Sequence, residues 1–404
     1  MPPALSETPL REPDSCGGGL QNVPTGIARK YHELFLLHIS PLTDPQLDPQ
    51  PVMQIRVQPF TVNKRVPLTI SRGTTTKTTN IWLILEHDGI EGWGEASPFT
   101  VGIPQTTEAI AQALQQLAPK LAALTPYDRQ PIDALVNESK LPSAAQTALD
   151  LALHDWLGKR VDLPLWQIWG LDRRRIVPTS VTIGINTPEA AQQRLRSWLE
   201  FTTVHAVKIK LGSPAGLEAD RAMCTAVFKD VPAGAKVSVD ANGGWDLEGA
   251  IAMSHWLADR GVTYLEQPLA TGSESDLLPL YKASPLPIFV DESCFTSRDI
   301  PALADKVHGI NIKLMKSGGL SEALRMIHTA QAHGLQLMFG CYSDSTLVNT
   351  AAAHLAPFAD HLDLDSHLNL LDDPFTGATM QDGCLVPTDL PGLGVGRARV
   401  TSLR

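Results

Sequence analysis

From Pro178 onward, short runs rich in β-branched residues alternate with amphipathic helical stretches, and this pattern constrains the fold more than any other feature. The runs recur about every 22 to 30 residues. They are TSVTIG (179–184), VKIKL (207–211), KVSVDAN (236–242), YLEQP (264–268), PIFVDES (287–293), GINIKL (309–314), LQLMFGC (335–341) and HLDLD (361–365). Eight consecutive βα units predict a closed (β/α)8 barrel, an α/β fold. The alternative, a doubly wound open sheet, requires a glycine-rich phosphate turn after the first strand, and the sequence has none.

The segment before the barrel has a different pattern. Strand-like runs begin at Met53 (MQIRVQPF), at 80–87 (NIWLILEH) and, after an Asp-Gly turn, at 92–96 (GWGEA). Helical spacing follows over residues 106–124 and 143–159. We therefore predict an α+β capping domain.

The predicted domain organisation has four parts. Residues 1–52, rich in Pro, Gly, Asp and Gln, are expected to form a flexible extension, because such a composition buries too little apolar surface. The other parts are the cap (53–175), the barrel (176–366) and a C-terminal segment that returns to the cap (367–404).

Composition excludes several classes of function. The formal net charge is −10 and no basic cluster is present, so neither nucleic acid nor an anionic membrane is an expected partner. No apolar run reaches the ~20 residues of a membrane helix, and the N-terminus lacks a signal-peptide pattern. The five cysteines are scattered, without a CxxC pair, which is typical of reduced thiols in a cytoplasmic protein. We expect a homo-oligomer that acts on a small molecule.

Charged residues fall where buried parallel strands should be apolar. Six of the eight runs carry them at or near the C-terminal end, where barrel active sites are built. They are Lys208, Lys210, Asp240, Glu266, Asp291, Lys313, Asp363 and Asp365. A single one would be read as a loop residue or a helix cap, but six strands charged at the same end indicate an active site.

Three carboxylates lie on three successive runs: Asp240, Glu266 and Asp291. Without a cation, such a cluster would repel itself and raise the pKa of its members. Oxygen ligands with no nearby His or Cys suit a hard divalent cation, Mg2+ before Zn2+. The alternative is that the carboxylates form salt bridges with neighbouring lysines.

Lysines lie on both sides of this cluster. Lys208 and Lys210 point to the same face of one strand, because they are two residues apart. Lys313 is on the sixth run, across the barrel from the second, so two lysines can face opposite sides of one substrate carbon. A lysine base must be neutral, and nearby cations and partial burial are expected to lower its pKa. Lys316 is expected in a loop, whereas Lys313 still belongs to the strand.

Five ordered motifs resemble the muconate-lactonising subgroup of the enolase superfamily: VKIKLG, VDANGGW, YLEQPL, VDES and NIKLMKSGG. The resemblance runs from Met53 to the C-terminus and includes GWGEASP in the cap. It implies a Mg2+-dependent enzyme that removes the proton next to a carboxylate and stabilises an enediolate. It assigns the metal to Asp240, Glu266 and Asp291, and acid/base roles to Lys210 and Lys313. Lys208 is expected to bind the substrate and to help electrostatically, and Asn242 and Glu292 are expected to orient the metal ligands.

The last run, HLDLD, resembles the dipeptide epimerases, in which an Asp-x-Asp pair holds the substrate's α-ammonium. Asp363 and Asp365 point to one face by strand alternation. Two carboxylates that bind the ammonium, opposite a metal that binds the carboxylate, would select a short zwitterion of matching length. The alternative for this pair is a cap for the following turn. By the same resemblance, Thr182 and Ser343 line the substrate pocket, and the cap segments 61–79 and 97–106 close over it.

Two departures bear on side-chain preference. Some Ala-Glu epimerases carry a glutamate-binding arginine in the cap, where this chain has Gly73 with Arg72 beside it, and Asp344 stands where relatives often have Glu. The expected function is epimerisation of the C-terminal residue of a dipeptide. The alternatives are an o-succinylbenzoate synthase, an N-acylamino-acid racemase or a muconate cycloisomerase, none of which needs the Asp pair, and a silent metal-binding scaffold protein.

Overall fold

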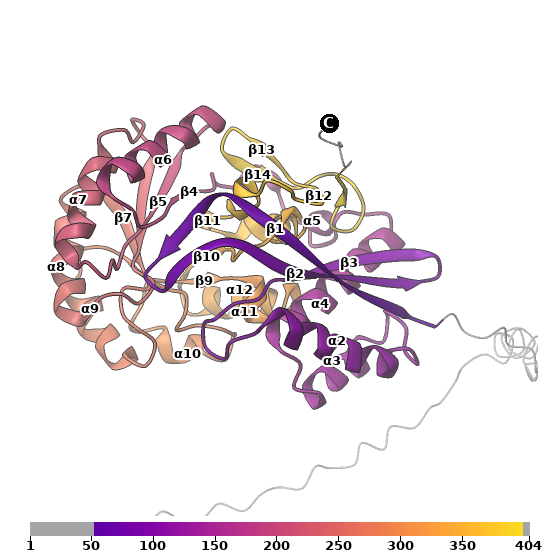
Figure 1. Cartoon of the computed structure of the whole chain (residues 1–404). Helices are drawn as coiled ribbons and strands as arrows, with labels where there is room; N and C mark the ends of the chain where they lie inside the picture. The colour runs from indigo at the N-terminus through magenta and orange to yellow at the C-terminus, as the bar shows by residue number, and fades with distance from the viewer. Residues whose placement is uncertain (1–51, 399–404) are drawn as a thin grey trace, which may run out of the picture. The chain divides into compact units, whose positions relative to one another are not determined.

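The computed structural model describes residues 52–398 (Figure 1). The N-terminal extension predicted over residues 1–52 lies outside these residues, apart from Val52. The described residues belong to one compact unit. The domain boundaries after residues 175 and 366 therefore stay a prediction.

A parallel sheet of eight strands confirms the predicted barrel. Each predicted run overlaps one strand: β4 (Val181–Ile183), β5 (Ala206–Lys210), β6 (Lys236–Asp240), β7 (Val262–Glu266), β8 (Ile288–Val290), β9 (Gly309–Ile312), β10 (Gln336–Gly340) and β11 (His361–Asp363). Neighbouring strands pair in sequence order from β4 to β11. The barrel closes just before β4, where the amide of Ser180 donates to the carbonyl of Leu362 over 2.8 Å.

Helices cover the outside of the barrel, as Figure 1 shows. They are α6 (Pro188–Phe201), α7 (Leu217–Phe228), α8 (Leu247–Ala258), α9 (Leu277–Ala283), α10 (Ile300–Leu303), α11 (Leu314–Ser317), α12 (Leu320–Ala332) and α13 (Thr346–Leu355). In α12 the buried residues follow helical spacing, which places one apolar stripe against the sheet: Leu320, Ala323, Met326, Ile327 and Ala330. Of the helices within residues 52–398, none is long and apolar enough to cross a bilayer.

The cap is an antiparallel sheet with helices packed against it. Its elements are β1 (Gln54–Ile70), β2 (Gly73–His87), β3 (Ile90–Ala96), α2 (Thr107–Leu121), α3 (Arg129–Glu138), α4 (Ser143–Arg160) and α5 (Leu165–Ile168). The sequence analysis did not predict α3, a helix of ten residues in which only Ile132 is fully buried. It also missed that β1 and β2 extend into one long hairpin across residues 61–79, which includes most of the expected lid.

Close packing of α4 on β3 depends on two glycines. A Cβ at Gly94 would lie 1.8 Å from the Ala148 carbonyl oxygen, and one at Gly92 would lie 2.0 Å from that of Ala152. Only a residue without a side chain allows this approach. The GWGEA motif thus fixes how the long hairpin sits on its helix.

The C-terminal segment packs on the base of the hairpin. It contains short strands, β12 (Phe375–Thr376), β13 (Thr379–Gln381), β14 (Cys384–Val386) and β15 (Gly396–Arg397). Asn63 donates to Asp372 over 2.7 Å, and the rings of Phe60 and Phe375 are 5.5 Å apart. The tip of the hairpin is held at the other side of the barrel, where Arg72 donates to the carbonyl oxygen of Asn242 over 2.9 Å. The hairpin therefore spans the barrel mouth.

Candidate active site

The strand register brings the predicted charged residues together at one end of the barrel. Lys210, Asp240 and Glu266 are the last residues of three adjacent strands and lie side by side. Asp291 follows β8 directly, and Lys313 follows β9 directly. All five side chains are buried. Lys313 is thus one residue beyond its strand, a small correction to the sequence prediction.

Each of the three carboxylates is bound by a lysine. Lys210 Nζ lies 2.7 Å from Asp240 Oδ2, and Lys313 Nζ lies 2.8 Å from Asp291 Oδ2. Lys208 pairs with Glu266 and also contacts Asp363 over 2.9 Å. Each carboxylate at the barrel mouth is therefore compensated by at least one lysine. The two lysines predicted as bases pair with different carboxylates, Lys210 with Asp240 and Lys313 with Asp291.

The prediction for Lys316 was wrong. This residue lies in the short helix α11 rather than in a loop, and it is buried. Its ammonium lies 2.7 Å from Asp291 Oδ1 and also donates to the backbone carbonyl of Asp291. This lysine, four residues after the strand end, is brought back to the site because the chain turns into a helix at Leu314. Lys316 therefore holds both the side chain and the backbone of Asp291 in place.

In this structure the pKa values of the two lysines are raised, whereas the sequence analysis expected nearby cations and partial burial to lower them. Burial disfavours the ammonium of Lys313, but Asp291 outweighs it and raises the pKa of Lys313 well above its ordinary value. Burial likewise opposes the charge of Lys210, yet Asp240 raises the pKa of Lys210. The neighbouring carboxylates decide the sign, because they lie closer to each ammonium than the other cations do.

The carboxylate cluster fits a hard divalent cation in its chemistry. Burial, together with the charges of Asp240 and Asp291, raises the pKa of Glu266, which shows that the three groups repel one another at close range. The donors are all oxygen, as Mg2+ prefers. Within residues 52–398, no three His, Cys, Asp or Glu side chains are arranged around a common metal position. Each carboxylate is instead turned toward a lysine, in the arrangement that the sequence analysis kept as the alternative.

Two outer residues surround this cluster as predicted. The side-chain amide of Asn242 donates to Asp240 over 2.9 Å. Glu292 lies next to Asp291 and forms a salt bridge of 2.7 Å with Arg72 at the hairpin tip. Burial and the charge of Asp291 raise the pKa of Glu292 to about 7. The guanidinium of Arg72 is therefore already paired with a barrel carboxylate, that of Glu292.

The Asp-x-Asp pair lies at the end of β11, and both carboxylates are buried. Asp363 accepts a hydrogen bond of 2.8 Å from Ser180 and pairs with Lys208. Asp365 accepts a hydrogen bond of 2.7 Å from the amide of Thr182. Burial and the charge of Asp363 raise the pKa of Asp365 to about 6. Among residues 52–398, no lysine or arginine forms a salt bridge with Asp365, in contrast to Asp363.

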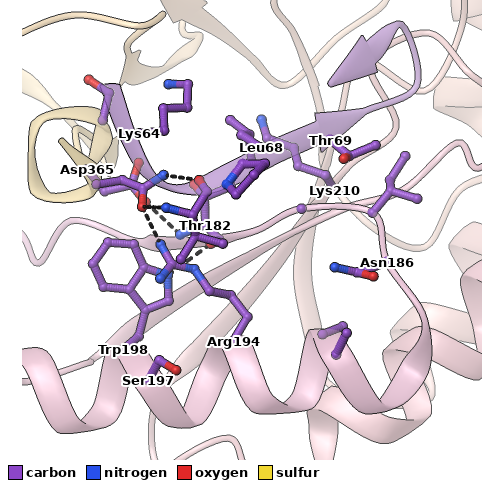
Figure 2. Close-up of a pocket in the computed structure, with 18 of the residues that line it drawn as sticks. Lys64, Leu68, Thr69, Thr182, Asn186, Arg194, Ser197, Trp198, Lys210 and Asp365 are labelled. Carbon is purple, nitrogen blue, oxygen red and sulfur yellow. Dashed lines mark hydrogen bonds between the residues drawn. The ribbon is translucent and has the colours of Figure 1, made fainter. Parts of the chain in front are cut away.

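Two cavities meet under the hairpin. The inner cavity, of about 360 Å3, is lined by Thr182 and the Asp pair (Figure 2). The outer cavity, of about 550 Å3, is lined by Lys313 and Ser343. Four residues line both cavities: Leu68, Lys210, Cys341 and Tyr342. The predicted pocket residues thus divide between two neighbouring cavities, and Lys210 lines both. Lys208, which the sequence analysis expected to bind the substrate, lines neither cavity, because its side chain is completely buried.

Three further polar or charged residues line these cavities and were not predicted as site residues from the sequence: Lys64, Arg194 and Tyr342. Lys64 enters the inner cavity from β1, and Arg194 enters it from α6, as Figure 2 shows. Arg194 packs over the ring of Trp198 at 4.2 Å. Tyr342 lies between the two cavities, next to the predicted Ser343. Nothing in strand or helix periodicity sets Lys64 or Arg194 apart from ordinary surface residues, whereas the position of Tyr342 after the seventh barrel strand was a usable signal.

The chain matches two family models that together cover most of the described residues. Residues 53–170 match the mandelate racemase/muconate lactonizing enzyme N-terminal domain, and residues 189–398 match the enolase C-terminal domain-like model. The chain belongs to the mandelate racemase/muconate lactonizing enzyme family. The resemblance drawn from the five motifs is thereby confirmed.

Relatives within this family are dipeptide epimerases. A hydrophobic dipeptide epimerase of Flavobacteria bacterium (strain MS024-2A) is 46% identical over 345 residues, which are 85% of this chain and 97% of that protein. An L-Ala-D/L-Glu epimerase of Bacteroides thetaiotaomicron is 33% identical, over 85% of this chain and 88% of that protein. The structure of a dipeptide epimerase from Enterococcus faecalis, complexed with Mg and the dipeptide L-Leu-L-Tyr, has a TM-score of 0.79 at 30% identity and covers 86% of this chain and 99% of its own.

Proposed function

We propose that this enzyme is a Mg2+-dependent dipeptide epimerase, an isomerase that inverts the α-carbon of the C-terminal residue. The main support for this proposal is that the residues expected to bind the two ends of a dipeptide line two neighbouring cavities. One cavity holds the Asp pair, the other holds Lys313, and Lys210 lines both. The similarity to dipeptide epimerases over nearly the whole of their length supports the same function. A cytoplasmic location and a homo-oligomer stay predictions.

Asp240, Glu266 and Asp291 are the residues that would hold the cation. When bound, Mg2+ supplies Lewis acidity toward the substrate carboxylate and offsets the carboxylate charge that favours protonated lysines. Asn242 orients Asp240, and Lys316 orients Asp291, through the hydrogen bonds described above. Lys208 contributes positive charge below the site through Glu266 and Asp363 rather than by contact with the substrate.

Lys210 and Lys313 carry the proton transfers in this proposal. Lys210 ends the second strand of the barrel and Lys313 follows the sixth, so a substrate carbon between them presents one face to each. One lysine, as a neutral amine, removes the α-proton, while the other, as an ammonium, delivers a proton to the opposite face. The C–H bond breaks on one side and a new one forms on the other, which inverts the carbon and leaves the lysines with exchanged protonation states.

Asp365, with Asp363, is proposed to bind the α-ammonium of the N-terminal residue in the inner cavity. Lys208 already compensates Asp363, whereas Asp365 has no such partner among the described residues. A substrate ammonium would supply the missing positive charge. Because the same molecule must reach the carboxylate cluster, the distance between the two ends selects for a dipeptide over a longer peptide.

Blocking the substrate amine tests this reading. We expect N-acetyl-L-Ala-L-Leu to be turned over with a kcat/KM at least about 30-fold below that of L-Ala-L-Leu, because the buried charge of Asp365 would lose its partner. The measurement is the rate of change in optical rotation. In the Asp365→Asn variant the two substrates should differ much less. A preference of the wild-type enzyme for the acetylated substrate would favour an N-acylamino-acid racemase instead.

The outer cavity favours an apolar C-terminal residue. Leu68, Ile70, Phe99 and Val101 contribute to its lining, and Arg72 is held by Glu292. We expect L-Ala-L-Leu to exceed L-Ala-L-Glu in kcat/KM by at least about tenfold, because a carboxylate placed against these apolar side chains would lose hydration, and the cap lysine that also lines the cavity, Lys77, is exposed to solvent. L-Ala-L-Gln is the matched uncharged control. Equal or better turnover of L-Ala-L-Glu would show that Arg72 leaves Glu292 to bind the substrate.

A further inference from the structure

Tyr342 occupies an unusual position that the mechanism above does not use. It follows β10, the seventh strand of the barrel, and lines both cavities. The ammonium of Lys313 lies over its ring, 4.8 Å from the centroid. The ring of Phe99, from the cap, stacks on Tyr342 with centroids 5.0 Å apart and planes inclined by 5°. One aromatic ring thus contacts both the cap and a lysine of the active site.

The backbone around Tyr342 is fixed from the cap side. Its amide donates to Asp344 over 2.9 Å, and the same carboxylate accepts a hydrogen bond of 2.6 Å from Ser97. Asp344 is buried. Because Ser97 and Phe99 belong to the same cap segment, that segment holds both the backbone and the ring of Tyr342.

The hydroxyl of Tyr342 is the second observation. It is buried and has no hydrogen-bond partner among the described residues. A buried tyrosine hydroxyl ordinarily finds a partner, because leaving it unpaired is costly. Tyr342 lines both cavities, and a dipeptide that occupies both would pass its peptide unit along this residue.

We propose that Tyr342 positions Lys313 through its ring and binds the substrate through its hydroxyl. The proposal rests on the proposed function, since it concerns the same dipeptide and the same lysine. The ring covers one side of the Lys313 ammonium and restricts its direction by a cation–π contact. The hydroxyl donates to an oxygen of the dipeptide, either its peptide carbonyl or its carboxylate. Tyr342 is a positioning residue with respect to Lys313 and a binding residue with respect to the substrate.

Two variants separate the ring from the hydroxyl. In Tyr342→Leu, which lacks the ring, we expect α-proton exchange in D2O to fall at least about tenfold more for the epimer whose proton faces Lys313 than for the one facing Lys210. In Tyr342→Phe, which keeps the ring, the ratio of the two exchange rates should stay at the wild-type value. The KM of both epimers should then rise roughly five- to tenfold through the lost hydrogen bond.

The substrates for this experiment are L-Ala-L-Leu and L-Ala-D-Leu, followed by mass spectrometry. Tyr281→Leu is the matched control, because Tyr281 stacks on His308 away from the cavities, and its loss should leave the ratio unchanged. Equal losses for both epimers in Tyr342→Leu would overturn the positioning role, and an unchanged KM in Tyr342→Phe would overturn the binding role. Exchange by the wild-type enzyme keeps the proposed function intact whatever these variants show.

Discussion

Replacing Lys313 by alanine should stop the interconversion of L-Ala-L-Leu and L-Ala-D-Leu in both directions, by roughly 100- to 10,000-fold. Inversion needs a proton acceptor on one face and a donor on the other, so loss of either lysine blocks it. Lys210 would still remove the proton that faces it. We therefore expect Lys313→Ala to retain α-proton exchange with D2O for one epimer only, and Lys210→Ala to retain it for the opposite epimer. Mass spectrometry of each epimer measures both.

Lys316→Ala is the control for this experiment. Like Lys313, Lys316 contacts Asp291, but it lines neither cavity and should reach no substrate proton. Its loss should therefore lower both exchange rates by the same factor. If Lys313→Ala interconverts the epimers at the wild-type rate, the two-lysine mechanism is wrong. An epimer-specific defect in Lys316→Ala would then identify Lys316 as the second base.

The Asp291→Asn substitution should weaken Mg2+ binding by more than about 100-fold, a loss that even outer-shell changes at metal sites approach. Turnover should fall by at least about 1,000-fold, since the cation supplies several kcal/mol of charge stabilisation. The structure adds a cost that the sequence did not reveal. Lys313 and Lys316 both pair with Asp291, and the variant leaves two buried ammonium groups without their counter-charge. We expect a folded protein with a lowered Tm.

Calorimetric titration with Mg2+ and thermal unfolding measure these effects separately. Asp150→Asn is the matched control, because Asp150 is also buried and salt-bridged, to Arg129 over 2.8 Å, but packs between the cap and the barrel helices. It should lower the Tm and leave Mg2+ affinity unchanged. Unaltered Mg2+ affinity in Asp291→Asn would rule out a ligand role for this residue.

The barrel could be predicted from the sequence because its signal is local and repeated. Runs such as VKIKL and GINIKL each indicate a buried strand, and the spacing between runs indicates a helix between the strands. Charged residues at the ends of such strands are conspicuous for the same reason, which is why the lysines and carboxylates of the site were found. The long β1–β2 hairpin was underestimated because residues 61–79 are largely polar, Pro67 lies among them, and residues 73–77 are all exposed, so this part lacks the alternation of buried and exposed residues typical of a strand.

Contacts between distant segments could not be predicted in this way. The burial of Lys316, the pairing of Arg72 with Glu292 and the entry of Lys64 and Arg194 into the inner cavity all depend on where elements far apart in sequence meet. The contact between Lys313 and Asp291, which raises the pKa of Lys313, also joins residues that follow different strands and could not be predicted.

In the proposed function the enzyme removes the α-proton of the C-terminal residue from either face of the α-carbon and returns a proton to the other face. Its most direct test is the incubation of L-Ala-L-Leu with the wild-type enzyme in D2O, followed by 1H NMR, with Mg2+ and with EDTA. The account predicts deuterium at the α-carbon of leucine, none at that of alanine, accumulation of L-Ala-D-Leu, and no reaction in EDTA. Deuterium at the alanine α-carbon, or the same exchange rate in EDTA, would contradict it.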